Sequence, residues 1–243
     1  MLAIMNLSPG LHRVGNDLVA LHLVVTDEGV TVIDTGLPGH WRPFLGALTS
    51  LGRTLDDVRG VVLTHGDSDH IGFAERLRAA TRVPVYVHEG DAARAMGEKP
   101  PATGPEPKRL GALLEFGWEA IRRDGLRTRH LTEVVTVRDG DVLDLPGSPR
   151  VLAMPGHSPG SIAVHVPAVD ALFVGDALTT RNVLTGVSGP QPAPFTDDPE
   201  GAIATLDRLE GLDAAWVLPG HGAPWTGGVP ALVAGIREVA AAR

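Results

Sequence analysis

Two histidines and two aspartates lie within six positions, at residues 65–70 of the stretch VVLTHGDSDHIG (61–72). The stretch begins as an apolar run that predicts a buried strand and continues into a pattern typical of a helix. Three later apolar runs also end in an imidazole or a carboxylate: VLAMPGH at His157, LFVGD at Asp176 and AAWVLPGH at His221. Because strand ends beside glycine-rich loops can direct side chains into one cleft, we expect these groups to lie together.

Imidazole and carboxylate groups are ligands that suit zinc, iron and manganese in proteins. The four runs supply more of them than one tetrahedral ion can bind, which favours two adjacent metal ions that share a carboxylate. Taken singly, each residue has a plainer explanation, since a histidine or aspartate after a strand often caps a turn or a helix. The agreement of four strand ends argues for the metal site. The candidate ligands are His65, Asp67, Asp69, His70, His157, Asp176 and His221.

The segments that carry these residues are predicted to be strands with helices between them. Strands are expected over residues 18–27, 29–36, 58–65, 83–90, 134–145, 150–156, 161–167, 171–176 and 214–220. Helices are expected over 41–52, 68–80, 198–210 and 229–242, with a long irregular loop over 177–197. Residues 97–130 indicate a loop and a helix inserted near the active site. This order predicts an α/β sandwich formed by residues 1–243 as a single domain.

The composition restricts both the chemistry and the partners. The chain has 243 residues and no cysteine, which excludes thiolate nucleophiles, disulfides and cysteine-ligated zinc. A formal net charge of −8 without a basic cluster argues against nucleic-acid binding. No apolar run reaches the ~18 residues of a membrane span, and the first residues lack the pattern of a signal peptide. We expect a cytoplasmic protein that acts on a small molecule, with neither nucleic acid nor membrane as a partner; the sequence predicts no oligomeric state.

The motifs VIDTG, THGDSDH, PGHSPGS, FVGDAL and LPGHG, in this order, resemble those of the metallo-β-lactamase superfamily. The resemblance covers most of the chain, from the turn at Asp34 onward. It implies a four-layer αββα sandwich with a dinuclear metal site at one edge, between the two sheets. It also implies a first metal held by His65, Asp67 and His157, a second held by Asp69, His70 and His221, and a bridge formed by Asp176.

In this family, a hydroxide between the two metals attacks an ester, lactone, thioester, amide or phosphoester. The resemblance therefore implies a metal-dependent hydrolase, here of a small ester, lactone or thioester, with Asp69 in the catalytic role. The motifs do not separate a thioesterase from a lactonase, and the absence of a leader peptide disfavours a β-lactamase. Two alternatives stay open. One is a di-iron redox enzyme resembling an oxygenase or oxygen reductase, and the other is a non-catalytic metal-binding sensor.

Asp67 departs from the family pattern, which has a histidine at this position in most members. A redox branch of the family, the flavodiiron proteins, carries an acid there and binds iron. Asp67 could bind a metal directly, act through a water molecule, or weaken the first site so that one metal remains. Direct binding would make the cluster less positive and would favour manganese or iron. We expect two divalent ions, with zinc first and manganese or iron as the alternatives that Asp67 introduces.

Five further residues are candidates for supporting roles. Asp34 and His88 each end a predicted strand and could orient the ligands, although a turn role for Asp34 and a capping role for His88 are the alternatives. Substrate contacts are expected from loops. Trp41 could belong to a lid near the metals, and Arg181 and Phe195 lie in the loop that follows LFVGD.

Overall fold

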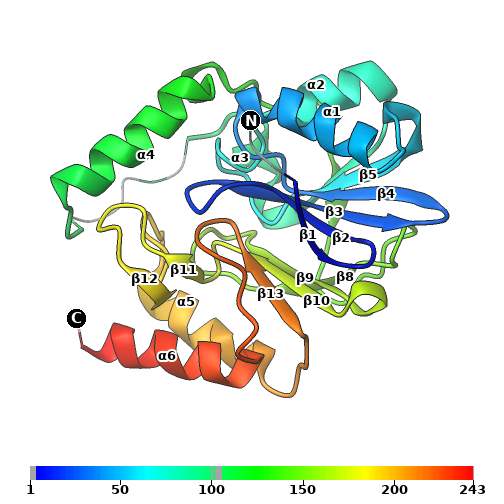
Figure 1. Ribbon diagram of the computed structural model, residues 1–243. Coiled ribbons are helices and arrows are strands. Elements are labelled where there is room, and N and C mark those ends of the chain that lie inside the picture. The colour runs from blue at the N-terminus through cyan, green and yellow to red at the C-terminus, as the bar shows by residue number, and fades with distance from the viewer. Residues whose placement is uncertain (1–3, 100, 102–105, 243) are drawn as a thin grey trace.

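Two β-sheets form the middle of the molecule, and helices cover the outer face of each (Figure 1). The computed structural model describes residues 4–99, 101 and 106–242. The first sheet has the strand order β1 (Met5–Ser8), β2 (Leu11–Gly15), β3 (Ala20–Thr26), β4 (Gly29–Ile33), β5 (Val58–Val62), β6 (Val85–His88) and β7 (Val135–Val137). The second has the order β13 (Trp216–Pro219), β10 (Ala171–Gly175), β9 (Ile162–Val166) and β8 (Arg150–Ala153).

The strand directions bring the loops that carry the site to the same ends of the sheets. In the first sheet β1 to β4 pair antiparallel, whereas β4, β5, β6 and β7 pair parallel. In the second sheet β8 and β10 are each antiparallel to β9, and β13 is parallel to β10. The carboxyl ends of β4, β5 and β6 therefore share one edge, and so do those of β8, β10 and β13.

The helices fall on the two outer faces of the sandwich and at its side (Figure 1). They are α1 (Trp41–Ser50), α2 (Ala74–Thr81), α3 (Ala92–Ala95), α4 (Leu110–Arg122), α5 (Pro199–Ala204) and α6 (Val229–Ala241). Figure 1 shows α1 and α2 beside the first sheet, α5 and α6 beside the second, and α4 apart from both groups. Within the described ranges, none of these helices is long and apolar enough to cross a membrane.

Three apolar cores separate the four layers. The first lies between the first sheet and α1 and α2, and it contains Leu23 and Phe44. The second lies between the two sheets and contains Val24 and Phe173. Leu23 and Val24 are neighbours on β3, so the alternation of the strand sends one side chain to each core. The third core joins the second sheet to α6 through Leu232. This confirms the predicted four-layer αββα sandwich.

Several element boundaries differ from those predicted. The strand predicted over 134–145 stops at Val137, because the turn at Asp139–Gly140, where Gly140 has φ +84°, ends it. The loop over 177–197 contains a hairpin of β11 (Thr179–Arg181) and β12 (Ser188–Gln191). Residues 68–73 are not helical, because they form the ligand-bearing loop, and α2 begins only at Ala74.

The predicted insertion at 97–130 contains α4, and residues 100 and 102–105 of it lie outside the described residues. One face of α4 is exposed and apolar, with Leu114, Trp118 and Ile121 each more than 60% accessible. The opposite face carries Phe116, which lines a cavity described below. That the segment is an insertion stays a prediction.

Candidate metal centre

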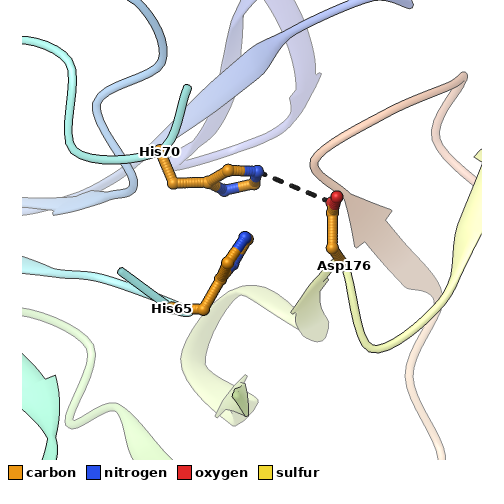
Figure 2. A group of neighbouring side chains, drawn as sticks. All are labelled: His65, His70 and Asp176. Carbon is orange, nitrogen blue, oxygen red and sulfur yellow. Dashed lines mark ion pairs between the residues drawn. The ribbon is translucent and has the colours of Figure 1, made fainter. Parts of the chain in front are cut away.

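The seven candidate ligands come from four loops, which follow β5, β8, β10 and β13, and the structure brings all of them together. Figure 2 shows the rings of His65 and His70, from the loop after β5, near the carboxylate of Asp176, which follows β10 of the second sheet. The ligand atoms form three overlapping groups, and within each group the atoms lie within 4.8 Å of one another. The groups are His65, His70 and Asp176; His65, Asp67 and His157; and Asp69, His70 and His221.

Asp67 lies between two histidines on one side of the cluster. Its Oδ2 atom is 3.6 Å from His65 Nε2 and 3.3 Å from His157 Nε2. On the other side, His221 Nε2 is 3.4 Å from Asp69 Oδ2. These separations exceed normal hydrogen-bond lengths and leave room for a bound atom between the partners.

Asp176 is the residue common to both sides. One of its oxygens, Oδ1, lies 3.6 Å from His70 Nε2 (Figure 2). The other, Oδ2, lies 3.1 Å from His221 Nε2 and 4.0 Å from His157 Nε2. The carboxylate therefore lies between His70 and His221 on one side and His157 on the other, a place from which it could contact both groups of ligands.

Each of the four histidines has an outer partner for its Nδ1 atom. Thr64 Oγ1 lies 3.2 Å from His65 Nδ1, and Thr196 Oγ1 lies 3.3 Å from His157 Nδ1. Both hydroxyls donate their own protons elsewhere, to Asp34 and to the Ala193 carbonyl, so they accept from the rings. Asp34 accepts from His70 Nδ1, and the Leu18 carbonyl accepts from His221 Nδ1. With Nδ1 so occupied, each ring directs Nε2 toward the centre as the atom available to a metal ion.

Asp34 organises the approach of β4 to β5. Its Oδ1 accepts from the backbone N–H of Thr64 at 2.8 Å, and its Oδ2 accepts from Thr64 Oγ1 at 2.8 Å and from His70 Nδ1 at 3.0 Å. The residue is buried and has φ +57°, a left-handed conformation that aspartate tolerates better than most residues. The hydrogen bond to His70 is the contact that the orienting role of Asp34 would need.

The donor set fits a metal ion. Among the described residues, His65 Nε2, His70 Nε2, His157 Nε2 and Asp176 Oδ1 are buried and have no hydrogen-bond partner. Buried polar atoms are nearly always paired, so a cluster of four such atoms fits metal binding better than a packing defect. Imidazole nitrogens with carboxylate oxygens form a donor set for zinc, iron or manganese.

The carboxylates also control the protonation of the histidines. Burial opposes protonation of His70, but Asp34 and Asp176 outweigh it and raise the pKa of His70 to about 9. His221 behaves similarly, because burial is outweighed by Asp176 and Asp69 and its pKa lies well above the usual value. Burial instead lowers the pKa of His65. A metal ion must displace the protons of His70 and His221, so its binding weakens as the pH falls.

Gly220 permits the close approach of the two halves of the centre. A Cβ atom on this residue would lie 2.4 Å from His70 Cε1 and 2.7 Å from Asp176 Oδ1. No side chain fits at those distances, so only glycine allows the loop after β13 to pass this close to the loops after β5 and β10.

Two functional residues were missed by the sequence analysis, and both belong to the segment after β6. Asp91 is fully buried and accepts hydrogen bonds from Gly66 N and Ser158 Oγ through Oδ2 and from Gly160 N through Oδ1, all at 2.7 Å. It therefore ties together the two loops that carry His65 and His157. The second, Arg94, forms an ion pair with Asp67. An acid just past a strand parallel to β5 was a signal that could have identified Asp91.

A cavity of about 560 Å³ opens above the candidate ligands. Asp67, Asp69, His157, Asp176 and His221 line it together with apolar side chains from several loops and from α4. The ring of Phe116 stands edge-on to His221, with 6.1 Å between centroids. The apolar lining residues are Leu37, Phe116, Ala120, Leu126, Val183 and Phe195.

Of the supporting residues predicted from loops, only Phe195 lines this cavity. Trp41 is buried in the first core against Phe44 and Phe73, because it begins α1 and faces the sheet; it is not the predicted lid residue. Arg181 does not line the cavity either, and its guanidinium instead pairs with Glu115 of α4 at 2.7 Å.

His88 does not belong to the candidate centre. It ends β6, and its Nδ1 accepts from the backbone N–H of Gly90 at 3.2 Å, so it caps the short 3₁₀ turn over Glu89–Asp91. The structure thus supports the capping alternative and gives no role to His88 in orienting the ligands.

Known proteins resemble this chain in sequence and in fold. The family model of the metallo-beta-lactamase superfamily matches residues 15–221. The probable metallo-hydrolase YflN of Bacillus subtilis is 32% identical over 189 residues, which span 70% of this chain and 66% of that protein. Among solved structures, the metallo-beta-lactamase family protein TTHA1429 of Thermus thermophilus superposes with a TM-score of 0.66 at 24% identity, covering 94% of this chain and 80% of that one.

A second solved structure, TTHA1623 in a di-iron-bound form, has a TM-score of 0.60 at 27% identity, covering 93% of this chain and 94% of that one. The family match extends over all four ligand-bearing loops, and the structural neighbours share the sandwich that positions them. This chain belongs to the metallo-beta-lactamase superfamily.

Proposed function

We propose that this protein is a metal-dependent hydrolase of a small, uncharged ester, lactone or thioester. The observation that carries the proposal is the cluster of buried, unpartnered Nε2 and carboxylate atoms, two of whose residues, His157 and Asp176, line a cavity that also has apolar side chains. Membership of the superfamily and the 32% identity to a probable metallo-hydrolase support the same class of reaction.

The candidate ligands would form two groups of three that share one bridging carboxylate. His65, Asp67 and His157 would hold one metal ion, Asp69, His70 and His221 would hold a second, and Asp176 would bridge them. When bound, such ions supply Lewis acidity and a hydroxide nucleophile at neutral pH. In the catalytic role we assign to Asp69, its carboxylate would accept a hydrogen bond from the nucleophile and so orient it toward the substrate. Burial raises the pKa of Asp69, but the nearby His221 and His70 outweigh it and lower this pKa, so the carboxylate is ionised and can act as a hydrogen-bond acceptor.

Two ions, with zinc first, are the expected occupants of the centre. Manganese and iron are the alternatives, because Asp67 adds a hard oxygen donor to the first site. The di-iron-bound form of TTHA1623, a structure 27% identical to this chain, supports the inclusion of iron.

The cavity favours an uncharged substrate with an apolar part. Apart from Arg94 and the histidines, the charged side chains that line it are acidic, and Arg94 is already paired with Asp67 and Asp197. Among the described lining residues, an anionic phosphodiester would therefore find no unpaired guanidinium or ammonium group outside the metal ions. The opposite wall, which includes Phe116, Val183 and Phe195, offers an apolar surface for an acyl chain.

A di-iron redox enzyme is the second candidate, favoured by Asp67 and by the di-iron-bound neighbour. The two functions are separated by one experiment on purified protein. Element analysis and oxygen consumption would be measured beside a hydrolysis screen over lactones, thioesters, carboxylic esters, phosphodiesters and β-lactams. We expect turnover of an uncharged ester, lactone or thioester, lost on chelation and restored by added metal.

The matched variants for this screen are His70→Ala and Trp118→Ala. Loss of the His70 imidazole should abolish turnover, whereas Trp118 lies on the exposed face of α4 and its removal should leave turnover unchanged. Metal-loaded protein that hydrolyses none of these substrates but consumes oxygen would refute the hydrolase proposal in favour of the redox one.

A further inference from the structure

We propose that Arg94 is a positioning residue for Asp67, which it holds with one carboxylate oxygen turned toward the candidate metal site. The inference rests on the proposed metal centre and concerns the one position at which the chain departs from the common histidine pattern. Arg94 Nε lies 2.7 Å from Asp67 Oδ1. The other oxygen, Oδ2, is the one that faces His65 and His157.

The guanidinium of Arg94 is itself anchored on its far side. Nη1 lies 3.0 Å from Asp197 Oδ2, and Nη2 lies 3.4 Å from Asp197 Oδ1. Arg94 is buried, and the planar fork of its guanidinium matches the two oxygens of a carboxylate. The hydrogen bonds to Asp197 orient the guanidinium, and its Nε atom lies beside Asp67 Oδ1 as an ion pair without a hydrogen bond between them.

The short segment that carries Arg94 is tied to the loop that carries Asp67. A Cβ atom on Gly66 would lie 2.8 Å from Ala95 N and 3.0 Å from Arg94 Cβ, so glycine at this position allows α3 to approach. Asp91, just before α3, accepts from Gly66 N at 2.7 Å. The segments that carry Arg94 and Asp67 are therefore held close together independently of the ion pair.

The chemical need for this contact comes from the difference between histidine and aspartate. An imidazole whose Nδ1 is occupied can present only Nε2, whereas a free carboxylate can rotate and offer either oxygen. Pairing Oδ1 with Arg94 removes this freedom and leaves Oδ2 for the metal. The guanidinium also brings a positive charge next to the negative charge that Asp67 introduces at a position usually occupied by neutral histidine.

A double-mutant cycle on the full chain tests the proposal, with Arg94→Gln, Asp67→His and the combination of both. Affinity and stoichiometry for zinc alone and for manganese alone would be measured by competition with a chromophoric chelator. With Asp67 in place, Arg94→Gln should weaken one of two equivalents by about 10- to 100-fold, the range for loss of a partner that orients a ligand. In the Asp67→His background the same change should have an effect of less than about twofold, because an imidazole needs no guanidinium.

A purely structural role for Arg94 would not produce this dependence on residue 67. Equal losses in both backgrounds, or two equivalents bound to Arg94→Gln with wild-type affinity, would overturn the proposal. If Arg94→Gln does not fold, Arg94→Lys replaces it in the cycle with the same criterion. Arg78→Gln, which removes a surface guanidinium paired with Glu75, is the matched control and should leave affinity unchanged. Wild-type protein that binds no metal would instead refute the proposed function, so the two failures are distinguishable.

Discussion

Replacing Asp34 by asparagine should weaken metal binding by reversing one hydrogen bond to His70. The oxygen of the new amide must stay at the Oδ1 position, because the backbone N–H of Thr64 can only donate. The amide NH₂ then takes the Oδ2 position, 3.0 Å from His70 Nδ1, where it also donates. His70 must present a lone pair at Nδ1 and carry its proton on Nε2, the atom that faces Asp176.

The size of the effect follows from these contacts. Partners that orient a metal ligand contribute about 10- to 100-fold to metal affinity, so the loss should fall in that range for the equivalent that His70 binds. Asparagine tolerates the left-handed φ of +57° at this position, so the backbone should be retained. In the metal-free protein the pKa of His70 should fall from about 9, because the negative charge of Asp34 is one of its main causes.

Two measurements check this prediction. Chelator competition gives the affinity of each metal equivalent, and NMR titration of the metal-free protein gives the pKa of His70. Asp57→Asn is the control, since it makes the same chemical change at an exposed carboxylate that binds Thr54. An Asp34→Asn protein that binds two equivalents with wild-type affinity, or whose His70 titrates as in the wild type, would refute the orienting role.

Three further predictions concern pH, stability and substrate binding. Burial lowers the pKa of His40 from 6.5 to about 4 in the folded protein. As the pH falls, His40 is therefore protonated in the unfolded chain before it is protonated in the folded one. The unfolding free energy of wild type relative to His40→Gln should therefore drop by about 3 kcal/mol between pH 7 and pH 4 in urea titrations, and a constant difference would contradict this. Asp91→Ala leaves buried donors unpaired and should cost at least about 3 kcal/mol by denaturation; a cost below about 1 kcal/mol would exclude its role in tying the loops. Phe116→Ala should lower kcat/KM roughly tenfold for esters with long acyl chains and less for acetyl esters, whereas Trp118→Ala should change neither, and equal effects of both variants would contradict the assigned acyl wall.

The fold and the meeting of the candidate ligands could be predicted because both depend on patterns along the chain. His65, His157, Asp176 and His221 each follow an apolar run, and parallel or equivalently directed strands bring such ends to one edge. Period-two burial then separates the side chains of one strand between two cores, which implies layers on both sides. The position of strand ends at one edge and the alternation of side chains along a strand do not depend on individual side-chain contacts. Both predictions therefore stay correct even when the predicted boundaries are wrong by several residues.

Contacts made by long side chains across loops could not be predicted in this way. Arg94 lies on a helix of four residues with no apolar periodicity, and its partners Asp67 and Asp197 are distant from it along the chain. For Trp41 the prediction was wrong for a different reason. Its residue type suggested a place at the cavity, but the amphipathic pattern of α1 directs its side chain into the first core. Which face of an element a side chain takes is decided by packing against elements elsewhere in the sequence.

The position of Arg94 changes the electrostatic argument that Asp67 introduces. Counting ligand charges alone, aspartate in place of histidine makes the centre less positive and so a weaker Lewis acid. Arg94 lies 2.7 Å from Asp67 Oδ1, and Asp197 binds the far side of its guanidinium. The positive charge of Arg94 therefore offsets part of the negative charge that Asp67 adds to the centre. A preference for manganese or iron over zinc must then come from the hardness of the Asp67 oxygen itself rather than from the net charge of the cluster.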